Sequence, residues 1–197
     1  MIEIILPIAL FGLVSAATPG PNTIMLTASG SAFGFQRTLP HILGITLGFP
    51  LMIFAIGLGV GEIFTRYPQV HLALKYVGAA YLLYLAWRIA QSGRPNAGEA
   101  KARPLYFLEA AGFQWVNPKA WMIAVSAIPA FTTIGGHYYA ELLLIAVIFT
   151  AVTLPSCAVW CLFGVGIRTL IRTEETARLV NLALAAVLAG SVVLLFR

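Results

Sequence analysis

The sequence contains no aspartate, and charged residues of both signs make up only 10% of its 197 positions. Soluble domains are about a quarter charged, so a water-soluble globule with this composition would expose apolar surface that it could not cover. Twelve Lys and Arg residues against seven acidic residues give a net charge of +5. Most of these basic residues fall between apolar blocks, which argues against a nucleic-acid partner.

Cysteines and catalytic motifs are also scarce. Cys157 and Cys161 lie one helical turn apart in an apolar run, which fits small buried side chains better than a redox pair or a metal site. The sequence has no Gly-rich phosphate loop, no His-Glu-x-x-His motif and no carboxylate pair suited to hydrolysis. We therefore expect no enzymatic activity, no ATP-driven step, no bound metal and no cofactor.

Because no basic residue precedes Arg37, we expect the apolar N-terminus to be retained, not removed as a signal peptide.

Six long apolar stretches occupy most of the chain. They cover approximately residues 4–33, 39–61, 70–90, 105–131, 138–167 and 177–196. A membrane-spanning helix needs about 20 mostly apolar residues. Each stretch is far longer than a barrel strand and lacks its inside/outside alternation. We predict an all-α integral membrane protein that forms one transmembrane domain over residues 1–197, with six helices in contact with lipid.

The second and fifth stretches share a pattern that indicates an internal repeat. Pro50 precedes Gly59-Val60-Gly61, and Pro155 precedes Gly164-Val165-Gly166, at a common offset of 105 positions (155 − 50 and 164 − 59). Three helices per half is an odd number, so the second copy enters the membrane from the opposite side, as in many secondary transporters. The predicted boundaries are approximately 1–92 for repeat one, 93–104 for a loop and 105–197 for repeat two.

The two repeat prolines, Pro50 and Pro155, have two interpretations. With their flanking glycines they would let the helices bend during alternating access, which makes them candidate hinges. Alternatively, the small residues around them simply permit close packing of membrane helices.

The placement of basic residues predicts which way the helices run. The loops after the first, third and fifth stretches contain Arg37, Arg88, Arg94, Lys101, Arg103, Arg168, Arg172 and Arg178, whereas the opposite side has only Arg66 and Arg197. By the positive-inside rule, the richer loops face the cytoplasm and both termini face outward.

The first stretch is interrupted at its midpoint by Thr18-Pro19-Gly20-Pro21-Asn22. Each proline removes a backbone donor, and together they free the carbonyls of Ser15 and Ala17, so a single helix cannot run through this segment. Within a bilayer such orphaned groups are tolerated only against protein or a wet cavity. We therefore predict a helix break at mid-membrane.

The fourth stretch repeats this arrangement with Asn117-Pro118-Lys119 at its midpoint. Asn is a good N-cap and Pro is favoured at the first helical position, so a half-helix is predicted to begin here. Lys119 then places a cation at the positive end of that half-helix, which calls for an anionic partner. A snorkelling lysine is the alternative. It is disfavoured because a Lys side chain reaches about 6 Å and the interface is about 15 Å away.

Two opposed half-helix starts offer amide donors that, with Lys119, would bind a carboxylate. The freed carbonyls, including that of Gln114, would accept hydrogen bonds from an ammonium, so the site would complement a zwitterion. The candidate substrate-binding residues are therefore Thr18, Pro19, Gly20, Pro21, Asn22, Asn117, Pro118 and Lys119.

Two further ionisable residues lie in apolar blocks. Glu109 could carry a proton or form an ion pair with a lysine, and pairing is favoured because buried charges are rarely uncompensated. Lys75 lies about one turn into the third stretch, where a coupling role and an anchoring role at the interface are equally compatible with the pattern.

Thr18-Pro19-Gly20-Pro21-Asn22, Gly78-Ala79-Ala80-Tyr81-Leu82 and residues 113–120 (FQWVNPKA) resemble the LysE/RhtB translocators over almost the whole chain. The resemblance implies a bacterial inner-membrane exporter of an amino acid or close derivative, driven by the proton motive force, with a six-helix core and a homodimer as its assembly. It does not identify the amino acid, and it is weakest after Ile167.

Two other functions are alternatives to amino-acid export. A metal-ion exporter would need core oxygen or thiolate ligands, and one Glu without any Asp provides few of them. A non-transporting membrane scaffold would have no use for two centred helix breaks. Export of a small molecule from a site at the two breaks is therefore the leading hypothesis.

Overall fold

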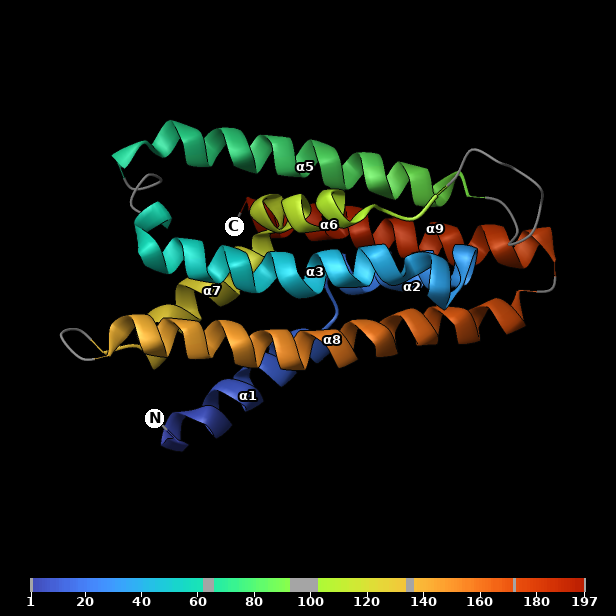
Figure 1. Ribbon diagram of the computed structural model, residues 1–197. Helices are drawn as coiled ribbons and strands as arrows, with labels where there is room; N and C mark the ends of the chain where they lie inside the picture. Colours follow the sequence, from blue (N-terminus) through green and yellow to red (C-terminus); the bar gives the residue numbers. More distant parts are fainter. Residues whose placement is uncertain (1, 62–65, 93–102, 134–136, 172, 197) are drawn as a thin grey trace.

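The computed structural model describes residues 2–61, 66–92, 103–133, 137–171 and 173–196, which contain helices and their connections and no strand (Figure 1). The elements are α1 (Ile2–Ala17), α2 (Pro21–Phe33), α3 (Phe35–Ala55), the π-helical η1 (Ile56–Val60), α5 (Pro68–Ala90), α6 (Phe107–Phe113), the 3-10 turn η2 (Gln114–Val116), α7 (Pro118–Phe131), α8 (Tyr138–Leu170), α9 (Glu174–Gly190) and the 3-10 segment η3 (Ser191–Leu195). Each of the six apolar stretches corresponds to one helix or to one consecutive set of helices, so the all-α prediction is confirmed. Most of the predicted loop, residues 93–102, lies outside the described residues.

Among the described helices, three are long and apolar enough to cross a membrane, and a fourth span results if the bent pair α1–α2 counts as one. The three are α3 with η1, α8, and α9 with the start of η3. Helices α6 and α7 are each too short to span a bilayer alone, and α5 includes Lys75, Arg88, three Tyr residues and one Trp. The structure thus supports a multi-pass membrane protein.

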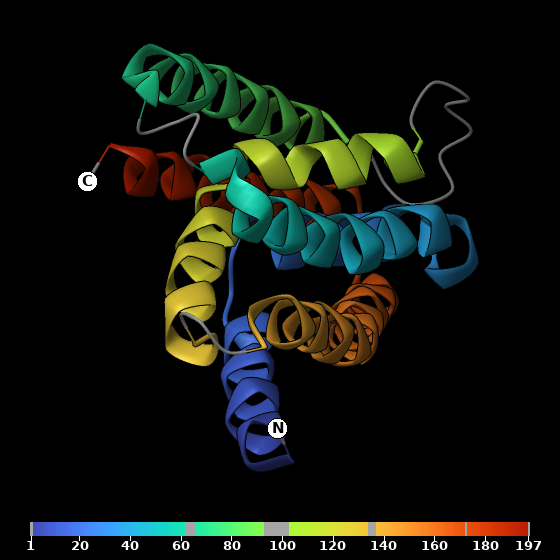
Figure 2. The same ribbon diagram turned by 60° about the vertical axis from the view of Figure 1, so that its left-hand side comes forward.

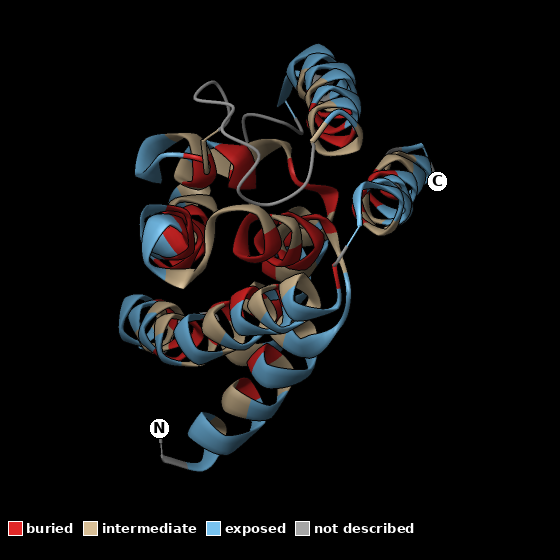
Figure 3. Cartoon of the chain, turned by 90° about the vertical axis from the view of Figure 1, so that its right-hand side faces the viewer, coloured by how far each residue is buried: buried red, intermediate tan, exposed pale blue. Residues whose placement is uncertain are grey.

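The outward faces of the helices are apolar. Large exposed side chains include Leu6, Leu51, Leu83, Leu143 and Phe163. Figure 3 shows the buried residues where the helices face one another and the exposed residues on the outside of the bundle. An apolar exterior on this scale is what a surface in contact with lipid requires.

The connections alternate between the two ends of the bundle. The turn between α2 and α3, the end of α5, the start of α6, the end of α8 and the start of α9 lie at one end, while the start of α1 and the end of η3 lie towards the other (Figures 1 and 2). Arg37, Arg88, Arg103, Arg168 and Arg178 belong to the first of these ends. The remaining basic residues predicted there, Arg94, Lys101 and Arg172, lie outside the described residues.

Both predicted helix breaks are present. Helix α1 ends at Ala17 and α2 begins at Pro21, with a bend of 57° between them. In the fourth stretch, α6 passes into η2, the chain becomes extended at Asn117, and α7 begins at Pro118. Asn117 caps α7, because its side-chain oxygen accepts the backbone N–H of Lys119 at 3.1 Å.

Helices α2 and α8 pack with their backbones in close approach. A Cβ on Gly30 would lie 2.1 Å from the carbonyl oxygen of Cys161, and a Cβ on Gly164 would lie 2.0 Å from that of Thr27. Only glycine permits this distance. The Thr27 hydroxyl crosses the same seam and donates to the carbonyl of Trp160 at 3.3 Å.

The two candidate hinges lie inside long helices, Pro50 in α3 and Pro155 in α8. The glycines that follow them differ in role. Gly59 has φ +105°, in the left-handed region that favours glycine, and it distorts the backbone within η1. Gly164, which holds the corresponding place in the shared sequence pattern, is helical and serves close packing instead. The sequence pattern is shared, but its local consequence is different in each half.

Candidate transport site

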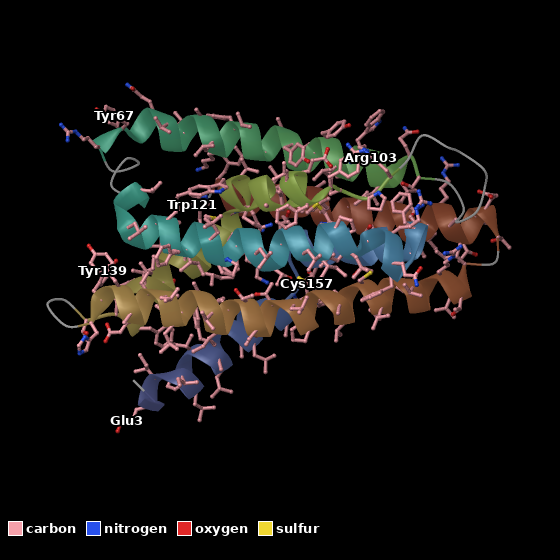
Figure 4. The ribbon with its side chains drawn as sticks, in the orientation of Figure 1. Glu3, Tyr67, Arg103, Trp121, Tyr139 and Cys157 are labelled. Carbon is pink, nitrogen blue, oxygen red and sulfur yellow. The ribbon has the colours of Figure 1, made fainter. Side chains whose placement is uncertain are left out.

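A cavity lies between the two helix breaks. It encloses about 530 Å³, including its opening, and is lined by α1, α2, α3, η2, α7 and α8. Ile45, Phe49, Ile123 and Phe149 make much of its wall apolar. Cys157, another lining residue, lies near the middle of the bundle's length (Figure 4). A mostly apolar pocket with a few polar groups is typical of a small-molecule site.

Lys119 spans the space between the breaks. Its ammonium donates to the backbone carbonyl of Thr18 and, at 3.1 Å, to the Thr18 hydroxyl. Gly20 makes room for the lysine stem, since a Cβ there would lie 2.7 Å from its Cδ. Both acceptors are neutral, and within the described part of the chain no carboxylate pairs with this ammonium. Lys119 thus lines the cavity as a cation without a protein counter-ion.

A pair of amide side chains joins the two breaks on another side of the cavity. Asn22 Nδ2 donates to Gln114 Oε1 at 2.9 Å, and Gln114 Nε2 donates to Asn22 Oδ1 at 3.3 Å. Gln114 is fully buried and also donates to the carbonyl of Ala110 at 2.8 Å. The sequence predicted a role for the backbone carbonyl of Gln114 but not for its side chain. A glutamine beside a predicted helix break could have indicated that its amide contributes to the site.

Helix α8 completes the site with residues that the sequence reasoning did not select. The Ser156 hydroxyl donates to the carbonyl of Ala16 at 2.9 Å and so satisfies a carbonyl near the first break. Thr153 and Cys157 line the same wall. Cys157 and Cys161 are buried free thiols. No local motif marks these α8 residues, because only the tertiary packing brings them to the breaks.

The remaining predicted site residues take the following places. Gly20, Asn22, Asn117 and Lys119 line the cavity. Thr18 contacts Lys119, and Pro19, Pro21 and Pro118 shape the two breaks. Two of the carbonyls expected to be free have partners: that of Ser15 accepts the Thr18 hydroxyl at 2.9 Å, and that of Gln114 accepts the N–H of Asn117 at 3.2 Å.

Glu109 forms an ion pair with an arginine and not with a lysine. Its carboxylate accepts two hydrogen bonds from Arg103, both at 2.7 Å, and one from the backbone N–H of Tyr106 at 2.8 Å. The hydrogen bond from Arg103 to this carboxylate raises the pKa of the guanidinium above its ordinary value. Lys75 lies elsewhere, with its ammonium 4.8 Å from the centre of the Phe196 ring. Neither Glu109 nor Lys75 lines the central cavity.

The described residues contain no group of three His, Cys, Asp or Glu side chains that could hold a metal ion. What the arrangement offers instead is one cation, several hydroxyl and amide groups and an apolar wall. These groups can bind a small molecule that carries both a carboxylate and a short side chain.

The sequence matches the family model of the LysE type translocators over residues 13–197. It is similar to the cysteine/O-acetylserine efflux proteins of Klebsiella pneumoniae (31% identical, 78% of each chain) and Escherichia coli K12 (29%, 94% of each). The Salmonella typhimurium protein of that name is 37% identical over 61% of this chain, and the match spans 62% of the relative's length. No solved structure matches. A family model that covers nearly the whole chain, including both breaks, makes this protein a member of the LysE type translocator family, a transporter and not an enzyme.

Proposed function

We propose that the protein exports an amino acid or a close derivative across the bacterial inner membrane, through the cavity at the two helix breaks. The observation that carries the proposal is Lys119, a cation in that cavity whose ammonium contacts the two oxygens of Thr18 and pairs with no carboxylate among the described residues. The carboxylate that every α-amino acid carries can replace the Thr18 oxygens as the partner of this ammonium. Hydroxyl and carbonyl oxygens in the same wall would receive its ammonium.

The substrate is cysteine or O-acetylserine. Several relatives are named as efflux proteins for this pair. The cavity suits both, because a short side chain fits against Phe49, Phe149 and Cys157. A long charged side chain would have to be buried against that apolar wall without an acidic partner.

The energy source is the proton motive force, and the architecture is a six-span inverted repeat with its site at the midplane. The sequence has no phosphate-binding loop to support ATP hydrolysis. Each half begins with a broken helix, and α1 packs on α8 as α6 packs on α3. If the two halves correspond, α1 matches α6 and α8 matches α3, so the α1–α8 contact has its equivalent in the α6–α3 contact. This correspondence supports the repeat.

The first test is efflux from cells that express the protein. Cells are loaded with a cysteine-containing dipeptide or with O-acetylserine, and the medium is followed by mass spectrometry. We expect faster release of cysteine or O-acetylserine than from cells with empty vector, and loss of that difference after an uncoupler collapses the proton gradient. If release equals the vector control while the protein is present in the membrane, the proposed substrates are wrong. Release that survives the uncoupler would contradict the proposed energy source alone.

Glu109 provides a second test of the coupling mechanism. Because Arg103 and the N–H of Tyr106 already hold its carboxylate outside the central cavity, we expect Glu109→Gln to export within about twofold of the wild type. The measurement is the initial export rate at matched protein abundance. Loss of export in Glu109→Gln would mean that this carboxylate is the proton carrier instead.

A further inference from the structure

A second cavity, of about 550 Å³, lies further along α2 than the amide pair, towards the end of the bundle where α2 and α5 finish. Asn22 and Thr23 line the central cavity, while Ser29 and Phe33 line the second one. At about 1.5 Å of rise per residue, the six residues from Thr23 to Ser29 correspond to about 9 Å. The two cavities therefore follow one another along a single helix. Arg103, on the rim of the second cavity, lies nearer the bundle end than Cys157 does (Figure 4).

The second cavity contains a cation without a counter-ion. Arg88 lines it, and its guanidinium donates to the backbone carbonyl of Arg103 at 3.4 Å and lies 5.9 Å from the centre of the Tyr84 ring. The other lining guanidinium, that of Arg103, is held by Glu109. Within the described residues no carboxylate pairs with Arg88. The net charge offered to an occupant is therefore positive.

His41 provides an independent indication of a ligand. Its side chain lines the cavity from α3 and is 1% exposed, yet neither ring nitrogen has a hydrogen-bond partner among the described residues. Buried polar groups are almost always hydrogen-bonded, so an unpartnered imidazole at a cavity wall indicates a missing partner. A neutral imidazole supplies one donor and one acceptor, so its N–H can bind a carboxylate.

Ser29, on α2, adds an acceptor to the lining of this cavity. Its hydroxyl lies 2.9 Å from that of Thr38, and the Thr38 hydroxyl donates to the carbonyl of Gly34 at 2.8 Å. A hydroxyl has a single hydrogen, so when Thr38 donates to Gly34, Ser29 is the donor to Thr38 and offers its lone pairs to the cavity. The walls thus offer donors at Arg88, an acceptor at Ser29 and both at His41.

We infer that the second cavity is a separate binding site for the exported amino acid, in which Arg88 and His41 bind the carboxylate and Ser29 receives the ammonium. The inference rests on the proposed function for the identity of its ligand. A molecule leaving this site reaches the central cavity by passing the Asn22–Gln114 pair. The chain therefore holds two amino-acid sites in series, and Lys119 belongs to only one of them.

Equilibrium dialysis of the purified full-length protein against ³⁵S-labelled L-cysteine, with a reductant present, tests this inference. We expect two bound molecules per wild-type chain, one in Lys119→Met, one in Arg88→Gln and none in the double variant. Arg88→Lys keeps the charge and should restore the second molecule. Cysteine methyl ester, which lacks the carboxylate, should not displace the cysteine that Lys119→Met retains.

The outcomes separate the two proposals. If the wild type exports cysteine but Lys119→Met binds none, or if both Arg88→Gln and His41→Gln retain two molecules, the second site is refuted and the proposed function stands. Phosphate that displaces the cysteine bound to Lys119→Met at equal concentration would mean that the cavity is a general anion site, which also refutes the inference. If the wild type neither exports nor binds cysteine, the proposed substrate fails together with the second site.

Discussion

Lys119→Met is expected to reduce export by about 10- to 100-fold, or to the vector background, while the protein remains inserted in the membrane. The substitution removes the one cation that lines the central cavity among the described residues. A hydrogen bond to a charged group contributes about 1.5–3 kcal/mol, which corresponds to the stated range. Methionine matches the length of the lysine stem, so the apolar contacts of the side chain are kept. The measurement is the initial export rate at matched protein abundance.

The matched comparison for this variant is Lys75→Met. It removes the same charge from another lysine in an apolar helix, whose ammonium lies over the Phe196 ring and not in the cavity. We expect Lys75→Met to keep at least about half of the wild-type rate, because a cation–π contact of this kind contributes little beyond anchoring. Full export by Lys119→Met would refute the role assigned to Lys119. Loss of export in both variants would show instead that positive charge in these helices is required in general.

Gly164→Ala is expected to destabilise the protein by about 3 kcal/mol, at the upper end of the cost of overpacking. The added Cβ would lie 2.0 Å from the carbonyl oxygen of Thr27, which is backbone and cannot rotate away. Helices α2 and α8 would have to separate, which would also disturb the bond from Thr27 to Trp160. Thermal unfolding in detergent, followed by circular dichroism or by loss of monodisperse protein, measures the effect.

Gly166 provides the control, two residues further along α8. A Cβ there meets no heavy atom within 4 Å, so Gly166→Ala should leave stability unchanged or raise it slightly through its better helix propensity. Equal unfolding midpoints for the two variants would contradict the close approach of α2 and α8. A lower midpoint for Gly164→Ala alone would support it.

The two helix breaks were predictable from the sequence because their causes are local. Proline removes a donor at Pro19, Pro21 and Pro118 whatever surrounds it, and Asn117 caps the next helix with its own side chain. The presence of Lys119 at the second break is likewise evident from the order of residues alone. These features depend on neighbours within four positions of the chain.

The rest of the site depends on contacts between distant segments. Ser156 satisfies a carbonyl at the first break, but nothing near it in the sequence indicates which helix it faces. The partner of Glu109, which lies outside the central cavity, differs from the expectation for a local reason. The expectation of a lysine followed from the need for charge compensation, whereas a nearer arginine, six residues away, meets that need at the start of α6. For Ser156 only the packing of α8 identifies the partner, whereas the partner of Glu109 was present within six residues of the chain.

The hydrogen bond from Ser156 to Ala16 joins residues that are 140 positions apart. Ribosomes add about 5–20 residues per second, so about 7–28 seconds separate the synthesis of the two partners. During that time the first helix break is in the bilayer, or beside the insertion machinery, without the hydroxyl that later satisfies its carbonyl. Biogenesis of this chain thus has an interval in which water, lipid headgroups or a chaperone must serve the break until α8 is made.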